Sequence, residues 1–314
     1  MSHMHGNDAG AEFNKISEIK KILSDQANDL SKPYKTLIGD DAAVINFQDL
    51  KLNLFASDMM VENIHFRTSY LTAAEIGYKS MATNVSDMAA MGGFPRYATI
   101  SLASPSKFDI TGFYEGVKAA CLEYEFHIAG GDLSLSELTV VSIAMIGSSY
   151  NQPIKRSTAA SGDHIFVTGS LGGSAAGLEL LKYNPGSTGP LIDIHKRPVA
   201  RLQQARAMSM SGASSAIDVS DGLIADINHI CQESHLGAKL QEIPVADGAT
   251  LANALYGGED YELVFSHPDP AQVELAFASL DLAQHDRIGQ FTIGNEITLQ
   301  GRPIEIKGYQ HGFV

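Results

Sequence analysis

The sequence predicts a folded protein of mixed α and β structure with two domains. A length of 314 residues corresponds to two domains of roughly 150 residues each. A hydrophobic content of 44% is enough for a large core and excludes a disordered chain. Apolar residues recur at helical spacing in some segments and form short continuous runs in others, which indicates both helices and strands.

The first half alternates predicted helices and strands. Helices are predicted at 12–31, 72–91 and 109–125. Strands are predicted at 44–47, 52–58, 97–104, 128–132 and 138–147. The helix at 72–91 has the clearest ends, because Thr72 and Glu75 form a capping-box pattern at its start, and Gly92-Gly93 with Pro95 ends it.

The second half is predicted to begin after a polar segment with Pro and Gly at 151–162, which separates domains 12–150 and 151–314. Strands are predicted at 164–168 and 304–306, an apolar strand after Glu262, and helices at 199–211 and 223–233. The Pro- and Gly-rich segment 184–198 is expected to be a mobile loop.

The glycine-rich segment 169–177 leads from a predicted strand into a helix. It is similar to a phosphate-binding loop but lacks the Lys-Ser/Thr ending of a P-loop. A tight strand-to-helix turn is the favoured interpretation, because glycine is the usual residue at such turns.

Composition limits the possible partners and compartment. A net charge of −14 disfavours nucleic acid and anionic membrane surfaces as partners. The sequence has no apolar run of about 18 residues, so no membrane span is expected, and its opening residues suggest no secretory signal. Cys121 and Cys231 lie far apart in helical contexts, so we expect reduced core thiols in a cytoplasmic protein.

Carboxylates recur in glycine-rich or apolar settings along the chain. The first pair, Asp40-Asp41, follows Gly39 and would by itself be compatible with a solvated turn. Adjacent like charges are costly unless a cation lies beside them, and a hard divalent cation prefers oxygen ligands. The recurrence of such acids therefore favours a metal site. The others are Asp58, Asp87, Asp132, Asp218, Asp221, Glu259 and Asp260.

Asp87 and Asp221 can each be interpreted as a structural residue or as a metal ligand. Asp87 is an acid in an apolar stretch near a helix C-terminus, where burial and the helix dipole both disfavour it unless it is paired or bound to metal. Asp221 lies at the turn into the helix 223–233, where it is expected to act as an N-cap and as a ligand. A lone His such as His65 is more often structural.

An acidic protein binds a phosphate substrate only through intervening cations, so such a substrate would imply several metal ions. Lys155 and Arg156 are candidate phosphate partners, and Tyr309 and Phe313 are candidates for an aromatic wall. The sequence shows no Ser-His-Asp set and no cysteine in a reactive setting, so a covalent nucleophile is not indicated.

Eight segments in order along the chain resemble the thiamine-monophosphate kinase family, which belongs to the aminoimidazole-ribonucleotide synthetase-like superfamily. They are GDDAAV (39–44), SDMMVENIHF (57–66), NVSDMAAMG (84–92), GGD (130–132), KRSTAASGD (155–163), IDVSDGL (217–223), GGEDYEL (257–263) and GYQHGF (308–313). IDVSDGL and GGEDYEL are specific to the resemblance, whereas Gly-Asp-Asp alone would not be. The chain departs from the family pattern at Ala56 and at Asn63.

The resemblance implies an α/β fold of two domains and a homodimer in which the N-terminal sheets pair. It implies transfer of the ATP γ-phosphate to thiamine monophosphate, giving thiamine diphosphate, with several Mg²⁺ ions. The implied metal ligands are Asp41, Ser57, Asp58, Asp87, Asp132, Asp218 and Asp221. The implied ATP contacts are Tyr114, Gly131, Asp132, Arg156 and Ser220, and the substrate contacts are His65, Glu259 and Tyr309. Asp87, Asp218 and Arg156 are implied to be catalytic.

Two alternatives stay open. One is another ATP-dependent kinase or synthetase of the superfamily. Selenophosphate synthetase would need a reactive Cys and a glycine-rich segment near the N-terminus, which this chain lacks, and the purine-pathway enzyme is expected to lack GGEDYEL. The other is a non-catalytic nucleotide- and metal-binding scaffold, against which the retention of Arg156 and the full acid set argues.

Overall fold

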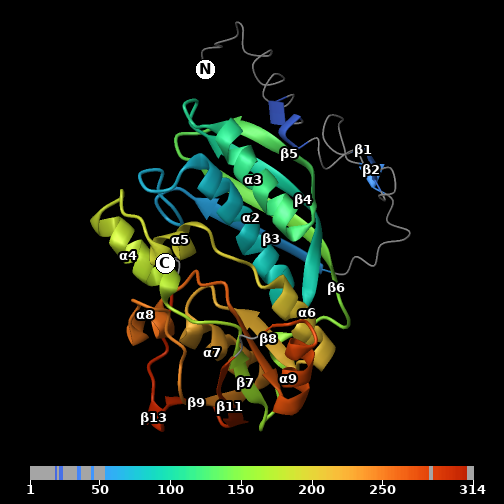
Figure 1. The fold of residues 1–314 in the computed structure, drawn as a ribbon, viewed down its shortest axis with the longest axis vertical. Coiled ribbons are helices and arrows are strands. Elements are labelled where there is room, and N and C mark those ends of the chain that lie inside the picture. The colour runs from blue at the N-terminus through green and yellow to red at the C-terminus, as the bar shows by residue number, and fades with distance from the viewer. Residues whose placement is uncertain are drawn as a thin grey trace, which may run out of the picture. The chain divides into compact units, whose positions relative to one another are not determined.

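The computed structural model describes residues 18–19, 21–23, 34–36, 44–45, 54–282 and 286–309. The chain divides into two compact units, Met1–Asn84 with Pro95–Gly147 and Val85–Phe94 with Ser148–Val314 (Figure 1). The segment 85–94 thus belongs to the second unit although it lies in the first half of the sequence. Most of the predicted helix 12–31 lies outside the described residues, and so do Asp40, Asp41 and Phe313.

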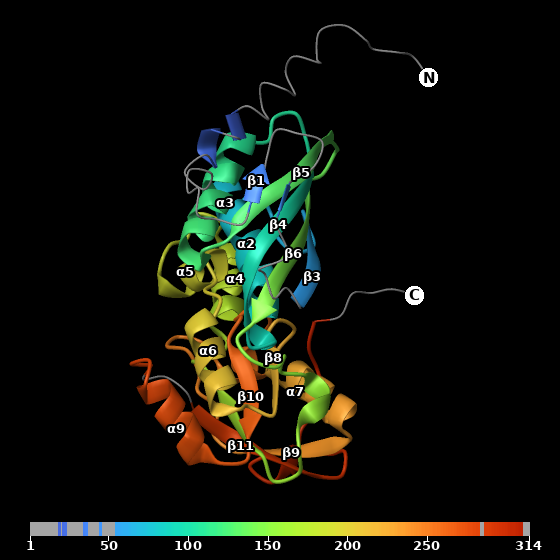
Figure 2. The ribbon, with the colours of Figure 1, turned by 90° about the vertical axis from the view of Figure 1, so that its right-hand side faces the viewer.

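The first unit is built on a four-stranded sheet with the order β3-β6-β4-β5. Its strands are β3 (Leu54–Val61), β4 (Gly93–Ser104), β5 (His127–Leu135) and β6 (Val140–Ser149). β3 pairs antiparallel with β6, and β4 pairs parallel with β5. Helices α2 (Ala73–Ala90) and α3 (Ile110–Tyr124) lie on one face of this sheet, as Figure 2 shows. Apart from it, β1 (Tyr34–Thr36) pairs antiparallel with β2 (Val44–Ile45).

Helices α2 and α3 approach closely because each carries a glycine at the crossing. A Cβ on Gly77 would lie 2.0 Å from the Phe113 carbonyl oxygen, and a Cβ on Gly116 would lie 1.9 Å from the Ala74 carbonyl oxygen. No other residue therefore fits at either position without moving the helices apart. The predicted capping box of α2 is confirmed: the Glu75 amide donates to Thr72 Oγ1 (3.2 Å), and the Thr72 amide donates to Glu75 Oε2 (2.7 Å).

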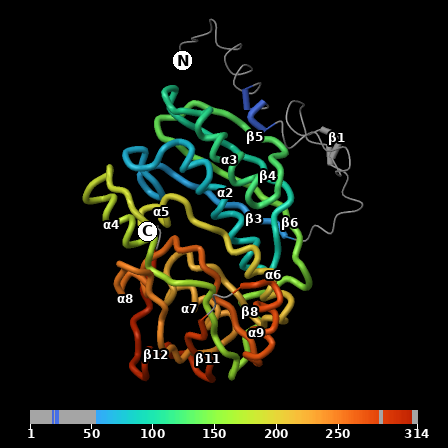
Figure 3. Tube along the Cα trace, viewed as in Figure 1, coloured from blue at the N-terminus to red at the C-terminus, as the bar shows by residue number. Residues whose placement is uncertain are grey.

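The second unit contains a seven-stranded sheet with the order β13-β12-β9-β11-β7-β10-β8. Its strands are β7 (His164–Val167), β8 (Ser215–Asp218), β9 (Leu236–Leu240), β10 (Leu263–His267), β11 (Asp286–Ile293), β12 (Ile297–Leu299) and β13 (Arg302–Pro303). Its helices are α4 (Gly173–Tyr183), α5 (Pro190–Lys196), α6 (Leu202–Ser211), α7 (Leu223–Ser234), α8 (Leu251–Tyr256) and α9 (Pro270–Ala278), with the short 3-10 helix η2 (Arg156–Thr158). Figure 3 follows this unit from the yellow-green α4 to the red β12.

Alternate residues of the central strands enter two separate cores. On one face, Val264 of β10 packs in a cluster with Ile224 and Ile227 of α7. On the other face, Phe265 of β10 packs with residues of α6 and α9, and its ring stacks on that of Phe277 at a centroid distance of 5.7 Å. All five residues of β10 are therefore buried, including the polar Ser266 and His267 that end it.

Two predictions about elements are wrong. The segment 184–198, expected to be a loop, contains helix α5, which begins at Pro190. This helix packs on α4 where Gly177 leaves room, since a Cβ there would lie 2.1 Å from the Leu191 carbonyl oxygen. The strand expected at 304–306 is absent, because the described chain is irregular from Ile304 to Tyr309.

The thiols agree with the expectation, since Cys121 and Cys231 are both free and buried. Among the described residues, no helix is long and apolar enough to cross a membrane.

We expect Gly116→Ala to lower the stability of the protein by about 1–3 kcal/mol, because the added methyl group forces α2 and α3 apart. Gly186→Ala is the matched control, since the nearest atom to its Cβ would be a side-chain oxygen at 3.6 Å. Urea unfolding followed by circular dichroism measures both variants. Equal midpoints for the two variants would contradict the close-approach argument.

Candidate active site

Three glycine-containing segments of the second unit meet at one edge of its sheet, the edge formed by the ends of β7 and β8 and the start of β10. β10 runs antiparallel to both β7 and β8, so the start of β10 lies beside the ends of the other two strands. The segment before β10 therefore meets the segments that follow β7 and β8. Backbone hydrogen bonds join the two specific motifs there. The Val219 amide donates to the Glu262 carbonyl (2.8 Å), the Tyr261 amide to the Val219 carbonyl (2.9 Å) and the Glu259 amide to the Ser220 carbonyl (2.9 Å).

The end of α2 reaches the same edge through a buried side-chain contact. Ser86 Oγ donates a 2.7 Å hydrogen bond to Oδ2 of Asp218, and both residues are buried. Asp87, the next residue, is half-buried in the last turn of α2. Asp87 thus lies one residue from a direct partner of Asp218, and both acids belong to the second unit.

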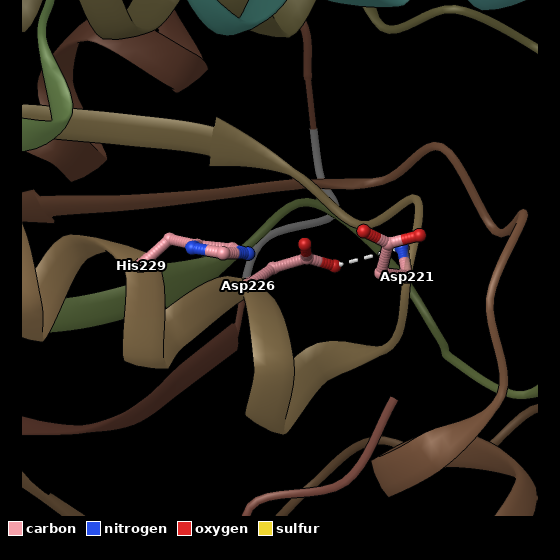
Figure 4. A group of neighbouring side chains, drawn as sticks. All are labelled: Asp221, Asp226 and His229. Carbon is pink, nitrogen blue, oxygen red and sulfur yellow. Dashed lines mark hydrogen bonds between the residues drawn. The ribbon is translucent and has the colours of Figure 1, made fainter. Parts of the chain in front are cut away.

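Asp226 lies between Asp221 and His229, and it comes from the first turn of α7 (Figure 4). One of its oxygens, Oδ2, accepts three consecutive backbone amides, from Ser220 (3.1 Å), Asp221 (3.2 Å) and Gly222 (3.1 Å). Burial, with the nearby charges of Asp218 and Asp221, raises the pKa of Asp226 to about 8.

The same three side chains could hold a cation. Ligand atoms of Asp221, Asp226 and His229 lie within 4.8 Å of one another. Two carboxylates and an imidazole are a donor set that suits several divalent metals.

Asp221 is not the N-cap of α7, so this prediction is wrong. The cap position belongs to Gly222, which has a φ of 119° and no side-chain cap. From inside the helix, Asp226 accepts the amides of Ser220, Asp221 and Gly222, which precede the first residue of α7. The side chain of Asp221 itself is half-buried.

The glycine-rich segment after β7 is a tight turn into α4, which supports the favoured interpretation. Asp260 of GGEDYEL accepts the amides of Gly172 (2.6 Å) and Ser174 (3.0 Å) at the start of this helix. Gly172 has a φ of 85°, and a Cβ there would lie 2.5 Å from the Ala254 nitrogen. A carboxylate of the protein thus occupies the amides that a phosphate would need.

The last acid of GGEDYEL, Glu262, is buried in an ion pair. Arg201 donates to it with two nitrogens: Nε donates to Oε2 (2.9 Å), and Nη2 to Oε1. Thr168 Oγ1 also donates to Oε2 (2.6 Å). Both carboxylate oxygens of Glu262 are thus bonded within the protein, and removal of either charge would leave the other unpaired. We therefore interpret this contact as structural rather than as available to a ligand.

Glu259 differs from the two acids that follow it, because its side chain is 25% exposed. Its Oε2 lies 3.5 Å from Nδ1 of the buried His195, which also contacts Ser174 Oγ (3.0 Å). Glu259 and Tyr261 have φ values of 65° and 52°, a left-handed conformation that is uncommon for residues other than glycine. Such conformations concentrate at functional sites.

The C-terminal tail lies against this edge as well. The Tyr309 amide donates to the Asp221 carbonyl (2.9 Å), and a Cβ on Gly308 would lie 2.5 Å from Cβ of Ala225. Tyr309 is 47% exposed, so its ring is accessible. The structure thus joins Tyr309 to Ser220, Asp221 and Glu259, which the sequence places far away.

Arg156 is placed differently from these residues. Its side chain is exposed, and its carbonyl accepts Oγ of Ser234 (2.7 Å) at the C-terminal end of α7. Asp221 and Asp226 lie at the N-terminal end of this helix, which is about 18 Å long at 1.5 Å per residue. The backbone of Arg156 therefore lies at the opposite end of α7 from Asp221 and Asp226.

In the first unit, β3 carries Ser57, which is exposed, and Asp58, which is half-buried with Oδ1 accepting the Met59 amide (2.7 Å). His65 follows in a turn, and its Nδ1 accepts the Val61 amide (3.0 Å). Asn63 has a φ of 67° in this turn, a conformation that asparagine tolerates better than most residues.

The Gly-Gly-Asp motif lies within β5, and each of its residues has a distinct environment. A Cβ on Gly131 would lie 2.0 Å from the Ile100 carbonyl oxygen, so the strand pairing itself requires this glycine. Gly130 has open space, and Asp132 is exposed. Tyr114 of α3 is buried, which raises its pKa to about 12.

The roles of Asp226 and His195 were missed in the sequence. Asp226 had a readable signal, because an acid in the first turn of a helix after Ser-Asp-Gly can reach back to the amides of that turn. His195 had none, since its contacts with Ser174 and Glu259 join three separate parts of the chain.

Because Asp260 is buried, we expect the stability of the protein to depend on pH. Its burial raises its pKa from the ordinary 3.8 to about 6, although the amides of Gly172 and Ser174 act in the opposite direction. The folded protein therefore binds this proton more tightly than the unfolded chain. Relative to Asp260→Asn, the stability of the wild type should fall by up to about 3 kcal/mol as pH rises from about 4 to about 6. Thermal or urea unfolding across this range measures the difference, and parallel curves for the two proteins would contradict it.

Comparisons with known proteins agree with the motifs. Residues 39–149 match the family described as AIR synthase related protein, N-terminal domain. The thiamine-monophosphate kinase of Aquifex aeolicus (strain VF5) is 35% identical over 320 residues, covering 96% of this chain and 97% of the relative.

Two solved structures are similar along almost the whole chain. Thiamine-monophosphate kinase from Stenotrophomonas maltophilia K279a has a TM-score of 0.81 at 29% identity and covers 94% of this chain and 98% of its own. AaThiL complexed with AMPPCP and TMP has a TM-score of 0.76 at 33% identity and covers 99% of this chain and 100% of its own. The resemblance and the α/β fold predicted from the sequence are thereby confirmed, and the chain belongs to the thiamine-monophosphate kinase family.

Proposed function

We propose that this protein transfers the γ-phosphate of ATP to thiamine monophosphate in a magnesium-dependent reaction that yields thiamine diphosphate. The family supports the reaction, and AaThiL, which is similar over 99% of this chain, was solved with AMPPCP and TMP. The observation that carries the proposal is the Ser86–Asp218 hydrogen bond. It joins two motifs that are 132 residues apart and supports a common site for Asp87 and Asp218.

The donor set of the second unit fits Mg²⁺, a hard cation that takes oxygen ligands. Asp218 and Asp221 both raise the pKa of Asp226, so their negative charges act on one buried region, where a cation would be favourable. We assign Asp87, Asp218 and Asp221 of this unit as ligands, and Ser57, Asp58 and Asp132 of the first unit as further ligands. Asp41 is assigned with them on the sequence motif alone. Bound Mg²⁺ would neutralise the charge of the phosphate groups.

The chain's own residues have the task of positioning two anionic reactants, because phosphoryl transfer requires little covalent chemistry from the protein. Gly131, Asp132 and Ser220 are proposed to contact ATP, together with Tyr114 and Arg156. The exposed Arg156 guanidinium would stabilise phosphate charge. The substrate phosphate is already ionised, so no general base is needed.

Thiamine monophosphate is assigned to His65, Glu259 and Tyr309. The carboxylate of Glu259 and the ring of Tyr309 are both accessible, and their backbones are bonded to neighbouring residues, Ser220 and Asp221. An anionic group and an aromatic face suit a cationic heteroaromatic ring such as thiazolium. We place the ATP-binding and dimerisation functions in residues 12–150 and completion of the substrate site in 151–314. The free thiols support a cytoplasmic location.

Asp87→Asn and Asp218→Asn should each lower kcat by at least 100-fold while leaving the fold intact, because they remove negative charge from the proposed metal site without changing side-chain shape. The measurement is ADP release on addition of thiamine monophosphate, with circular dichroism to check folding. Asp247→Asn is the control, since this aspartate is exposed in the same unit. Near-normal turnover by either site variant would contradict the assignment.

A homodimer is proposed through the exposed face of the first unit's sheet. Phe55 and Met59 of β3 are 75% and 50% exposed on this face, with Ser57 between them. Exposed large apolar side chains on one sheet face favour pairing with a second copy.

Phe55→Asp should therefore shift the protein from dimer to monomer, because the new charge would have to be buried at the interface. Sedimentation equilibrium measures the change. Leu122→Asp is the matched control, because Leu122 is 61% exposed on α3 of the same unit, away from the sheet. A wild-type monomer, or an equal effect of both substitutions, would exclude this face as the interface.

A further inference from the structure

We infer that Asp226 is a positioning residue that sets the geometry of the loop 219–222 and thereby of the metal and substrate contacts. The inference rests on the proposed function of the same site. Asp226 was not among the residues that the motifs single out, and its carboxylate is turned toward the loop backbone (Figure 4).

The amides of the loop converge on this single side chain. Three consecutive N–H groups, from Ser220, Asp221 and Gly222, point at one oxygen of Asp226 at 3.1 to 3.2 Å. Consecutive backbone amides of this kind form a concave nest that binds an anion. Here the acceptor is a side-chain oxygen of the protein, because Asp226 lies on the first turn of α7 and is only 2% exposed.

The carbonyls of the same loop are bonded to other parts of the site. The Ser220 carbonyl accepts the Glu259 amide, and the Asp221 carbonyl accepts the Tyr309 amide. Asp226 therefore anchors the amides of a peptide segment whose carbonyls hold two proposed substrate contacts. Asp218, which adjoins the loop, and Asp221, which lies within it, are proposed metal ligands.

Rotation of these peptide groups would consequently disturb metal and substrate together. Gly222 has a φ of 119°, and a Cβ there would lie 2.9 Å from the Tyr256 carbonyl oxygen. A glycine in this conformation has other backbone angles available, so an external anchor is needed to select one. The three hydrogen bonds from Asp226 are such an anchor.

The side chain could act through its acceptor oxygen or through its charge, and two substitutions separate these cases. Asp226→Asn keeps an oxygen at the nest, whereas Asp226→Ala removes it. A positioning role requires that Asn retain function and that Ala lose it. Direct metal ligation by Asp226 requires that both lose it to a similar extent.

Hydrogen exchange of the amides 220–222, followed by mass spectrometry, reports on the nest without reference to activity. We expect at least a tenfold faster exchange in Asp226→Ala and near-wild-type exchange in Asp226→Asn. The Mg²⁺ concentration for half-maximal activity should rise by 10- to 100-fold in the Ala variant, as for other residues that orient metal ligands. KM for thiamine monophosphate should rise with it.

Asp163→Ala is the matched control, because Asp163 is also a buried carboxylate that accepts a backbone amide, from Ala160 (2.9 Å). Asp163 precedes β7, whereas Asp218 ends β8, so the two aspartates lie at opposite ends of the strands. We expect this variant to lose stability without a change in Mg²⁺ requirement or in exchange at 220–222.

The inference is overturned if exchange at 220–222 is unchanged in Asp226→Ala, if Asn is as damaging as Ala, or if Asp163→Ala raises the Mg²⁺ requirement equally. A wild-type protein that releases no ADP with thiamine monophosphate would instead overturn the proposed function, and the exchange result would still decide whether Asp226 anchors the loop.

Discussion

The second unit depends on hydrogen-bond donors that hold carboxylates close together at one edge of its sheet. Asp218, Asp226, Asp260 and Glu262 are all at least nine-tenths buried, and a buried carboxylate is costly unless it is bonded or paired. Each has a specific donor: a serine hydroxyl, three loop amides, two helix amides and the arginine guanidinium, respectively.

These donors divide the acids into structural and available groups. Asp260 and Glu262 use their oxygens to cap α4 and to pair with Arg201, so they shape the edge. Glu259, only one residue before Asp260, keeps a partly exposed carboxylate. Glu259 and Tyr261, on either side of Asp260, have a left-handed backbone conformation, so the motif is not a regular strand at this point.

The glycines of the motifs serve the same edge by allowing backbones to approach. A Cβ on Gly258 would lie 2.3 Å from the Ser220 carbonyl oxygen, and one on Gly308 would lie 2.8 Å from the Asp221 carbonyl oxygen. Both glycines thus let a separate segment pack against the loop that Asp226 anchors. Close backbone packing explains why glycine occupies these positions, and no bound phosphate is needed to explain it.

Local patterns in the sequence determined the fold class, the ends of α2, α3 and α7, and the family, because caps, apolar spacing and short motifs are read from neighbouring residues. Helix α5 and strands β9 and β11 were not predicted, since they are stabilised by packing and pairing with distant segments. Only the tertiary structure decided which acid meets which donor. The bond from Ser86 to Asp218 and the bonds from the loop amides to Asp226 depend on how β8, α2 and α7 are brought together. A carboxylate's role follows from the groups that surround it.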